Sequence, residues 1–235
     1  MVKVLVLRAS GKIRPISIDD VDIIQIPVIK ITPNENVINK ISLEDANYMV
    51  IMSTTVVKYL RSTLEKLGDS VRVIGVGPQT CNEMEKLGVK CEVPSEFSSY
   101  GIIEMMKKLP RGKVVILRSL RGGNDYVKNE LQRIGYYVVE YGIYDLTPDP
   151  ISVDIACRLI NYVDYVVFMS SMTYETMKDC AKNVLKGKTV IAIGRVTANR
   201  MKSDGINALM PGEYTLNGVL RILINHLMIS SESLG

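Results

Sequence analysis

Residues 137–148 read Tyr-Val-Val-Glu-Tyr-Gly-Ile-Tyr-Asp-Leu-Thr-Pro, and a related stretch occurs earlier in the chain at residues 23–33. Both stretches end in Thr-Pro. Each is rich in β-branched or aromatic residues and closes with a proline that limits further ladder pairing, so each predicts a strand leaving one compact unit for another. Two crossings predict two lobes joined by a pair of strands, with one lobe assembled from both ends of the chain.

An internal repeat supports this arrangement, because identical residues recur at a constant spacing in the two halves. The spacing is 117 positions over most of the repeat. It is 110 positions for the first strand, where residues 3–8 match residues 113–118, and 115 positions for the Thr-Pro pairs. We infer two copies of one ancestral unit, with the matched pairs Tyr48 and Tyr165, Val50 and Val167, Met52 and Met169, Ser53 and Ser170, Gly77 and Gly194, Thr80 and Thr197, and Gly88 and Gly205.

Apolar runs alternate with segments of helical periodicity in both copies. Strands that alternate with helices of ten or more residues are typical of parallel sheets. We therefore expect an α/β fold with two doubly wound, flavodoxin-like parallel-sheet lobes joined by a two-stranded β-ladder. The expected division is residues 1–24 plus 149–235 for the first lobe, 25–34 and 137–148 for the linker, and 35–136 for the second lobe.

The two copies differ after their first strand. In the second copy a turn at residues 118–123 leads into a helix predicted over residues 124–134, whereas the first copy offers only residues 13–22 at that place. One lobe is therefore expected to lack a helix. A further helix is predicted from Ser53 to the stop at Gly68, with an inner stripe of leucine and valine side chains.

Length and composition are those of a soluble protein. The chain has 235 residues, of which 47% are hydrophobic, enough for one to two domains. The apolar start at residues 2–7 is too short for a signal-peptide core, and no run reaches the roughly 18 apolar residues of a membrane span. We expect a cytoplasmic protein with no membrane contact.

Charge and cysteine content exclude several classes of partner. The net charge of +4 is mild and forms no basic run, so nucleic acid is not an expected partner, whereas a small polyanion is. The chain has a single histidine, and its cysteines show no C-x-x-C spacing, so we expect neither a zinc site nor a disulfide framework. Reduced thiols are predicted at Cys81, Cys91, Cys157 and Cys180.

Candidate binding residues follow the predicted strands, where loops lead into helix N-termini. Hydroxyl and backbone N–H groups at such positions stabilise anions through hydrogen bonds and the helix dipole. The alternative for each residue is an ordinary N-cap with no further role. The candidates are Ser53, Thr54, Pro78, Thr80, Ser170, Ser171, Val196 and Thr197.

Two arginines end equivalent strands. Arg118 opens a glycine-rich turn that contains a second cation, Arg121, and Arg8 is its counterpart in the first copy. Such a turn favours carboxylate binding, with a solvated loop as the alternative. No catalytic triad, set of metal ligands or pair of carboxylates is evident at the loop ends, so an enzyme of this sequence would work by positioning and with few proton donors.

The order of these motifs resembles that of the uroporphyrinogen-III synthase family. In both copies a strand ends in Arg, a crossing strand ends near Thr-Pro, a strand ends in Ser, and a G-x-x-T turn opens a helix that ends in Gly. The resemblance covers residues 3–227. It implies a cytoplasmic lyase of tetrapyrrole (haem, sirohaem or cobalamin) biosynthesis that cyclises hydroxymethylbilane to uroporphyrinogen III, with inversion of ring D through a spiro intermediate and without metal or coenzyme. We expect it to act as a monomer.

The resemblance also implies roles for residues. Tyr144 matches the family's cleft tyrosine and is the expected proton donor, although it could instead be a cross-strand aromatic of the ladder. Ser53 and Ser170 match the strand-end serines, and Thr80 and Thr197 match the threonines of the two turns. The family often has Gly-Pro-Thr-Thr at the second turn, whereas this chain has Gly-Arg-Val-Thr, so Val196 offers only its backbone N–H.

A second class of function remains open at this level. A non-catalytic, two-lobed cytosolic protein that binds or senses a small molecule uses the same architecture, because function resides in the site and not in the fold. Turnover of hydroxymethylbilane separates the two classes.

Overall fold

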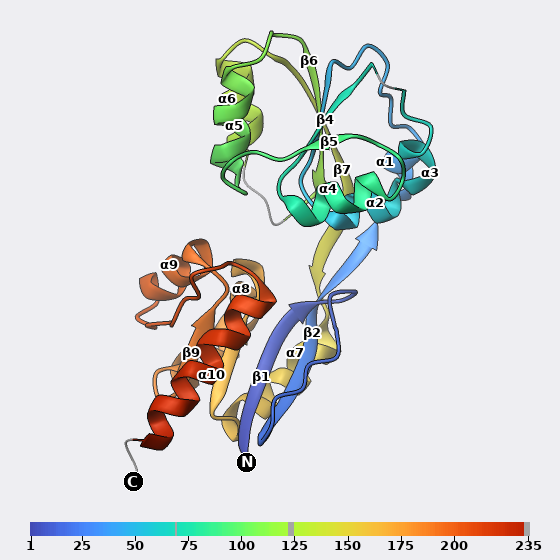
Figure 1. Ribbon diagram of the computed structural model, residues 1–235. Coiled ribbons are helices and arrows are strands. Elements are labelled where there is room, and N and C mark those ends of the chain that lie inside the picture. Colours follow the sequence, from blue (N-terminus) through green and yellow to red (C-terminus); the bar gives the residue numbers. More distant parts are fainter. Residues whose placement is uncertain (69, 122–124, 233–235) are drawn as a thin grey trace. The chain divides into compact units, whose positions relative to one another are not determined.

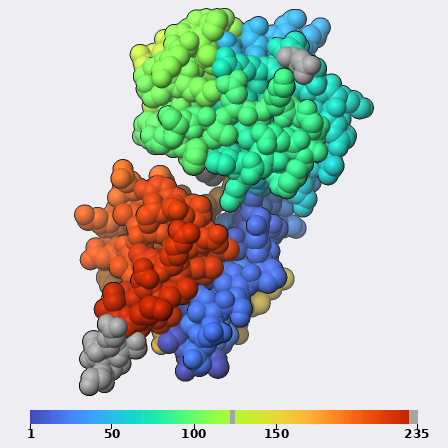
Figure 2. All heavy atoms as spheres, in the orientation of Figure 1, coloured from blue at the N-terminus to red at the C-terminus, as the bar shows by residue number. Residues whose placement is uncertain are grey.

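The computed structural model describes residues 1–68, 70–121 and 125–232, which fold into two units (Figure 1). Unit 1 consists of Met1–Ile31 and Thr147–Gly235, and unit 2 of Thr32–Leu146. The divisions fall inside β2 (Val21–Pro33) and β7 (Tyr137–Pro148), the strands that end in Thr-Pro. Unit 1 thus combines the two ends of the chain, as the blue and red atoms in Figure 2 show.

Unit 2 is built on a parallel sheet with the strand order β5-β4-β3-β6-β7. Its other strands are β3 (Tyr48–Ile51), β4 (Arg72–Gly75), β5 (Cys91–Glu92) and β6 (Lys113–Ser119). Its helices are α1 (Glu35–Ile38), α2 (Thr54–Tyr59), α3 (Arg61–Leu64), α4 (Pro78–Glu85), α5 (Ser99–Lys107) and α6 (Tyr126–Arg133).

Both faces of this sheet are buried. Side chains alternate along each strand, so Val50 and Ile116 share one face, where α5 and α6 supply Ile102 and Leu131. The intervening strand residues, such as Met49, are equally buried on the other face, against which α2 and α4 pack. Each fully buried aliphatic side chain stabilises the unit by about 1.5–3 kcal/mol relative to its exposed state.

Unit 1 repeats this plan with the parallel order β2-β1-β8-β9. On one face, Val4 and Val6 pack against Val219 and Leu223 of the last helix. On the other face, the ring of Tyr174 meets that of Phe168 edge-on, with centroids 5.5 Å apart. The elements are β1 (Val2–Ala9), β8 (Tyr165–Phe168), β9 (Thr189–Ala192), α7 (Pro150–Leu159), the 3-10 turn η1 (Ile160–Tyr162), α8 (Ser171–Leu185), α9 (Arg195–Ser203) and α10 (Leu216–Glu232).

The parallel strand pairs within each unit confirm the predicted α/β fold class, and the strand orders of the two units agree with the repeat. The order β4-β3-β6-β7 in unit 2 corresponds to β9-β8-β1-β2 in unit 1. The counterpart of β5 is reduced to a single bridge between Ile191 and Leu209. Residues 10–20, all of them described, contain no helix. The prediction that this copy lacks a helix after its first strand is therefore confirmed.

Two helices differ from expectation. The helix predicted from Ser53 is broken at Leu60, whose backbone (φ −104°, ψ 14°) ends α2 and precedes α3. Helix α7, which is not among the helices predicted from the sequence, follows β7 directly and has Pro150 in its first turn. Proline is favoured in a first turn because its missing N–H has no partner there in any case.

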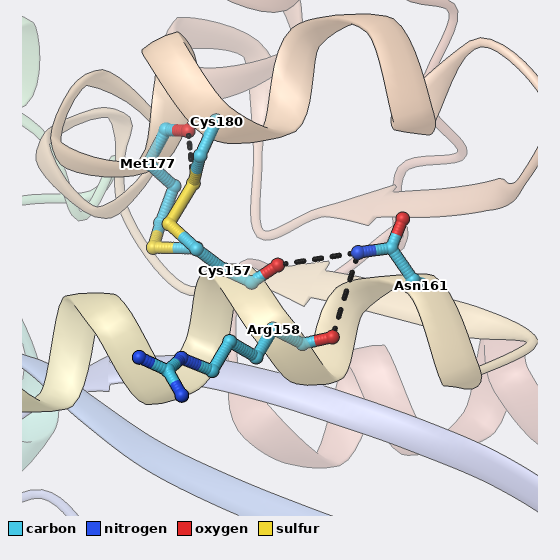
Figure 3. Close-up of a disulfide and its surroundings, with 5 residues drawn as sticks. All are labelled: Cys157, Arg158, Asn161, Met177 and Cys180. Atoms are coloured by element: carbon cyan, nitrogen blue, oxygen red, sulfur yellow. Dashed lines mark hydrogen bonds between the residues drawn. A yellow bond between two sulfur atoms is a disulfide. The ribbon is translucent and has the colours of Figure 1, made fainter.

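The prediction of reduced cysteines is wrong. Cys81 of α4 is bonded to Cys91 of β5, with their Cα atoms 5.1 Å apart. Cys157 of α7 is bonded to Cys180 of α8, with a Cα separation of 5.8 Å (Figure 3). Both pairs form because helices pack against neighbouring elements, a tertiary effect that the spacing of cysteines along the chain does not reveal.

Candidate functional site

In unit 2 the carboxyl ends of the strands bring a serine and a tyrosine into contact. Ser53 follows β3, adopts extended backbone, and caps α2 by accepting a hydrogen bond from the N–H of Thr55 (3.2 Å). Its Oγ also lies 3.0 Å from the hydroxyl of Tyr144, a hydrogen bond in which either oxygen can donate. The expected proton donor is therefore held at the start of a helix.

A bulge sets the position of Tyr144 on β7. Arg118 pairs with Gly142 and Ser119 with Tyr144, so β7 carries one extra residue between the two pairs. Bulges of this kind re-aim a side chain. Tyr144 is only 7% exposed and lies beside Tyr59, with ring centroids 6.3 Å apart. Burial, followed by the nearby Tyr144 and then Glu35, raises the pKa of Tyr59.

The remaining candidates of unit 2 lie at the starts of α2 and α4. Thr54 is the first residue of α2. Pro78 occupies the first turn of α4 after Gly77, and Thr80 is buried, with its N–H donating to the carbonyl of Gly77 (3.0 Å). The two helix starts therefore stand at the same sheet edge, after β3 and β4.

In unit 1, Ser170 caps α8 through a capping box. Its Oγ accepts the N–H of Thr173 (3.1 Å), and the Thr173 hydroxyl accepts the N–H of Ser170 (3.3 Å). At the start of α9, Thr197 is buried while Val196 is 76% exposed. An open pocket of about 620 Å³ lies between α8 and α9. It is lined by Ser171, Glu175, Val196, Asn199, Arg200 and Ser203.

The pocket contains polar groups, but its cation is already paired. Arg200 forms an ion pair with Glu175 and a second with Asp204 (3.1 Å). Of the candidates, the structure thus brings Ser171 and Val196 to one pocket in unit 1, and Ser53 and Tyr144 into contact in unit 2.

The two strand-end arginines differ in their partners. Arg118 donates from Nε to Glu140 (2.8 Å) and from Nη2 to Glu140 (3.1 Å) and Asp125 (2.8 Å). The hydrogen bond to Glu140 is the main reason that the pKa of Arg118 is raised. Arg8 is buried and donates from Nη1 to the side chain of Gln25 (3.1 Å). Gly122 and Gly123 of the predicted glycine-rich turn lie outside the described residues.

Comparison with known proteins identifies the family. The family model described as uroporphyrinogen-III synthase HemD matches residues 15–221. The chain belongs to the uroporphyrinogen-III synthase family. The resemblance read from the sequence motifs is thereby confirmed.

Two curated relatives carry a provisional form of the family's name. A protein of Archaeoglobus fulgidus, provisionally named a uroporphyrinogen-III synthase, is 27% identical over 230 residues, covering 94% of this chain and 97% of the relative. One from Methanothermobacter thermautotrophicus, with the same provisional name, is 27% identical over 172 residues, covering 67% of this chain and 68% of the relative.

Solved structures of uroporphyrinogen-III synthases share the fold. A mutant enzyme from Thermus thermophilus superposes with a TM-score of 0.68 at 17% identity, covering 98% of this chain and 100% of the other. The enzyme from Helicobacter pylori gives a TM-score of 0.64 at 13% identity, covering 96% and 99%. At such identities the agreement concerns the fold alone.

Two aromatic residues that are not among the predicted candidates also lie at these helix starts. Phe97 and Tyr214 are 63% and 55% exposed. A Cβ atom on Gly77 would lie 3.5 Å from Phe97, and one on Gly194 would lie 3.0 Å from Tyr214, so each ring covers the turn before a G-x-x-T helix. The two aromatics are 117 positions apart, but a search for identical residues passes over a Phe matched with a Tyr.

Over residues 1–68, 70–121 and 125–232, no three His, Cys, Asp or Glu side chains gather as metal ligands. In the same part of the chain, no helix has the length and apolar character needed to cross a membrane.

Proposed function

We propose that this protein is a uroporphyrinogen-III synthase, which cyclises hydroxymethylbilane to uroporphyrinogen III with inversion of ring D. Membership of the family supports the reaction class. The observation that carries the proposal is the contact between Tyr144 and Ser53, since it holds a buried hydroxyl at the carboxyl edge of a parallel sheet. Sites in open α/β sheets lie at that edge.

The reaction requires that the protein fold the substrate and that a proton donor assist the departure of the substrate's terminal hydroxyl. Loss of the terminal hydroxyl gives an electrophilic azafulvene, and the already substituted carbon of ring D attacks it. The resulting spiro intermediate fragments and recloses with ring D turned over. The protein's main task is to hold the linear chain so that the crowded carbon reacts, which is catalysis by proximity and orientation.

Tyr144 is the proposed proton donor to the departing hydroxyl. The Ser53 hydroxyl fixes the phenol at 3.0 Å, and Tyr59 covers its ring. General acid catalysis by a positioned side chain contributes about 10²–10⁴-fold. The counterpart of Tyr144 in the other copy, 115 positions earlier, is Ile29, so the repeat supplies this group only once.

Substrate binding is proposed for the helix starts of both units. Backbone N–H groups or hydroxyls at Thr54, Thr80, Ser170, Ser171, Val196 and Thr197 offer hydrogen bonds and dipoles that suit carboxylates. Pro78, which has no N–H, contributes by fixing the first turn of α4 beside these donors. The exposed rings of Phe97 and Tyr214 offer faces for pyrrole rings. The proposed partner is therefore this small polycarboxylate, taken up by a monomer.

The isomer ratio of the product tests the proposal. Without an enzyme, hydroxymethylbilane closes through its unsubstituted end and gives the type I isomer. Purified protein, with no metal or coenzyme added, should give mainly isomer III, measured by chromatography of the oxidised porphyrins. Isomer I at the spontaneous rate, in the presence of folded protein, would contradict the proposal and leave a non-catalytic binding protein.

Tyr144→Phe tests the proposed acid. The loss in kcat should approach the hundredfold end of the general-acid range if the phenol is the main donor. A loss under about tenfold would mean that orientation of the substrate provides most of the rate. Tyr59→Phe is the matched control, because it removes a hydroxyl from the neighbouring ring and should leave kcat nearly unchanged.

A further inference from the structure

The repeat places an arginine at the same point of each unit. Arg8 near the end of β1 and Arg118 near the end of β6 are 110 positions apart, the spacing of the first strands. Their cross-strand neighbours also correspond. Gln25 pairs with Val6, and Glu140 pairs with Ile116, so Gln25 occupies the place on β2 that Glu140 holds on β7.

In unit 2 the charge of the arginine is compensated within the protein. Glu140 receives two hydrogen bonds from Arg118, at 2.8 and 3.1 Å, and Asp125 receives a third at 2.8 Å. Asp125 stands at the N-cap of α6. One nitrogen, Nη1, is buried without a partner, but the cation itself faces two carboxylates.

In unit 1 the equivalent charge has no such partner. Arg8 is 7% exposed, its Nε is buried without a hydrogen bond, and within the described chain no carboxylate pairs with it. Its partner, Gln25, is a neutral amide that also donates to the carbonyl of Arg14 (2.6 Å). Burial, and then the positive charge of Arg14, lower the pKa of Arg8.

Unit 1 lacks counterparts of both Glu140 and Asp125, for identifiable reasons. Glutamine replaces glutamate at the cross-strand position, and residues 10–20 form no helix, so unit 1 has no counterpart of the N-cap Asp125. A buried charge without a compensating group is strongly unfavourable, because desolvation of the cation is not repaid by an opposite charge. Such a group is a candidate for ligand recognition, since a bound anion removes the imbalance.

We propose that Arg8 binds one carboxylate of the ligand at the carboxyl end of β1, and that Arg118 is a structural ion pair with no part in binding. The incoming carboxylate displaces the Gln25 amide from Nη1 and gains charge-assisted hydrogen bonds from a guanidinium that is already desolvated. Identification of the ligand as a tetrapyrrole bearing carboxylate side chains rests on the proposed function. The anion site itself rests on the unpaired cation.

Exchanging the two cross-strand residues tests the inference. Gln25→Glu gives Arg8 the internal partner that Arg118 has, so it should raise the Tm and weaken binding of the octacarboxylate uroporphyrin III, a non-reacting oxidised form of the proposed product, about tenfold or more. Arg8→Gln should weaken binding to a similar extent. Glu140→Gln is the matched control, because it should lower the Tm and leave affinity unchanged. Binding is followed by porphyrin fluorescence at fixed ionic strength, beside the KM for hydroxymethylbilane.

The outcomes separate this inference from the proposed function. A folded Gln25→Glu protein with wild-type affinity for uroporphyrin III would overturn the role of Arg8. Absence of uroporphyrin binding in the wild type, together with an unchanged KM in Gln25→Glu, would overturn it equally. A third outcome is that the protein binds uroporphyrin through Arg8 but leaves hydroxymethylbilane unconverted. This outcome would support the carboxylate site and reject the synthase activity.

Discussion

Ser53 and Ser170 occupy the same position in the two copies, yet their hydroxyls have different partners. The Oγ of Ser53 contacts the phenol of Tyr144, whereas that of Ser170 is engaged in a capping box with Thr173. The difference arises because the residue equivalent to Tyr144 is Ile29. An inherited cap has thus acquired a second contact in one copy only.

Serine-to-alanine changes at these two positions should therefore have different effects. Both variants lose a helix cap, which costs about 1 kcal/mol of stability. Ser53→Ala also frees the phenol of Tyr144 and should lower kcat several-fold, while Ser170→Ala should leave kcat close to wild type. Steady-state kinetics and thermal unfolding of both proteins provide the comparison. Equal kinetics in the two variants would show that the Ser53 hydroxyl acts only as a cap.

At the residue scale, the sequence located the candidates better than their partners. Ser53 and Arg118 could be named because the repeat and the strand ends mark their positions, and Tyr144 because it matches the cleft tyrosine of the family that the motifs resemble. Glu140 as the partner of Arg118 could not, because this contact depends on which residues of β6 and β7 stand opposite each other. The bulge that aims Tyr144 is likewise a property of the paired strands and has no signal in either strand alone.

Among the elements, the contact of α7 with α8 carries the disulfide between Cys157 and Cys180 (Figure 3). A cross-link between residues 23 positions apart limits the unfolded chain and contributes about 3 kcal/mol in the chain-entropy model. A Cys157→Ser/Cys180→Ser protein should melt roughly 6–12 °C lower than the oxidised wild type. Calorimetry with and without a thiol reductant measures the difference, and identical melting of all samples would mean that these thiols are not bonded in solution.

Asp204 links α8 to the end of α9. Its carboxylate accepts hydrogen bonds from the hydroxyl of Tyr174 (2.9 Å) and from Arg200 (3.1 Å), and Lys178 lies 3.4 Å away. Burial alone would raise the pKa of Asp204, but the bonds from Tyr174 and Lys178 and the charge of Arg200 outweigh it and lower the pKa.

This arrangement predicts a pH-dependent effect of Asp204→Asn. A carboxyl group whose pKa is lowered by folding stabilises the native state above its ordinary pKa of about 4, and that contribution is lost as the pH falls through the native value. The Tm of the variant should lie below that of the wild type at neutral pH, and the gap should close in acid. A gap that stays constant from pH 7 to pH 3 would assign the effect to packing instead of charge.

The elements themselves were predictable where the pattern was strong. Buried strands such as β3 and β8 stand out as apolar runs that recur at the repeat spacing. The break at Leu60 could not be foreseen, because a leucine stripe continues through it. Helix α7, which carries the partner of Cys180, has no counterpart among the helices predicted from the sequence.

For the molecule as a whole, the repeat explains why two units arise from one chain. Each unit has a parallel sheet covered on both faces, and each holds one disulfide. Unit 2 is continuous in sequence, and its two ends meet, because the N–H of Asn34 donates to the carbonyl of Ile143 (2.8 Å) and its side chain donates to Gly142 (3.2 Å). A fragment comprising unit 2 therefore contains the whole strand order β5-β4-β3-β6-β7.

Residues 32–146 produced alone should fold. Their core, which includes Val50, Ile116 and Leu131, draws all its members from this range, so no buried apolar contact of that cluster is lost on excision. The fragment should unfold cooperatively on heating and protect the amides of β3 and β6 from hydrogen exchange. A fragment of residues 32–136 is the matched control, because it lacks β7 and with it Glu140. In this fragment β6 becomes an open edge and Arg118 loses a carboxylate partner. If the amides of the 32–146 fragment exchanged as fast as those of the 32–136 fragment, the stability of unit 2 would depend on the rest of the chain.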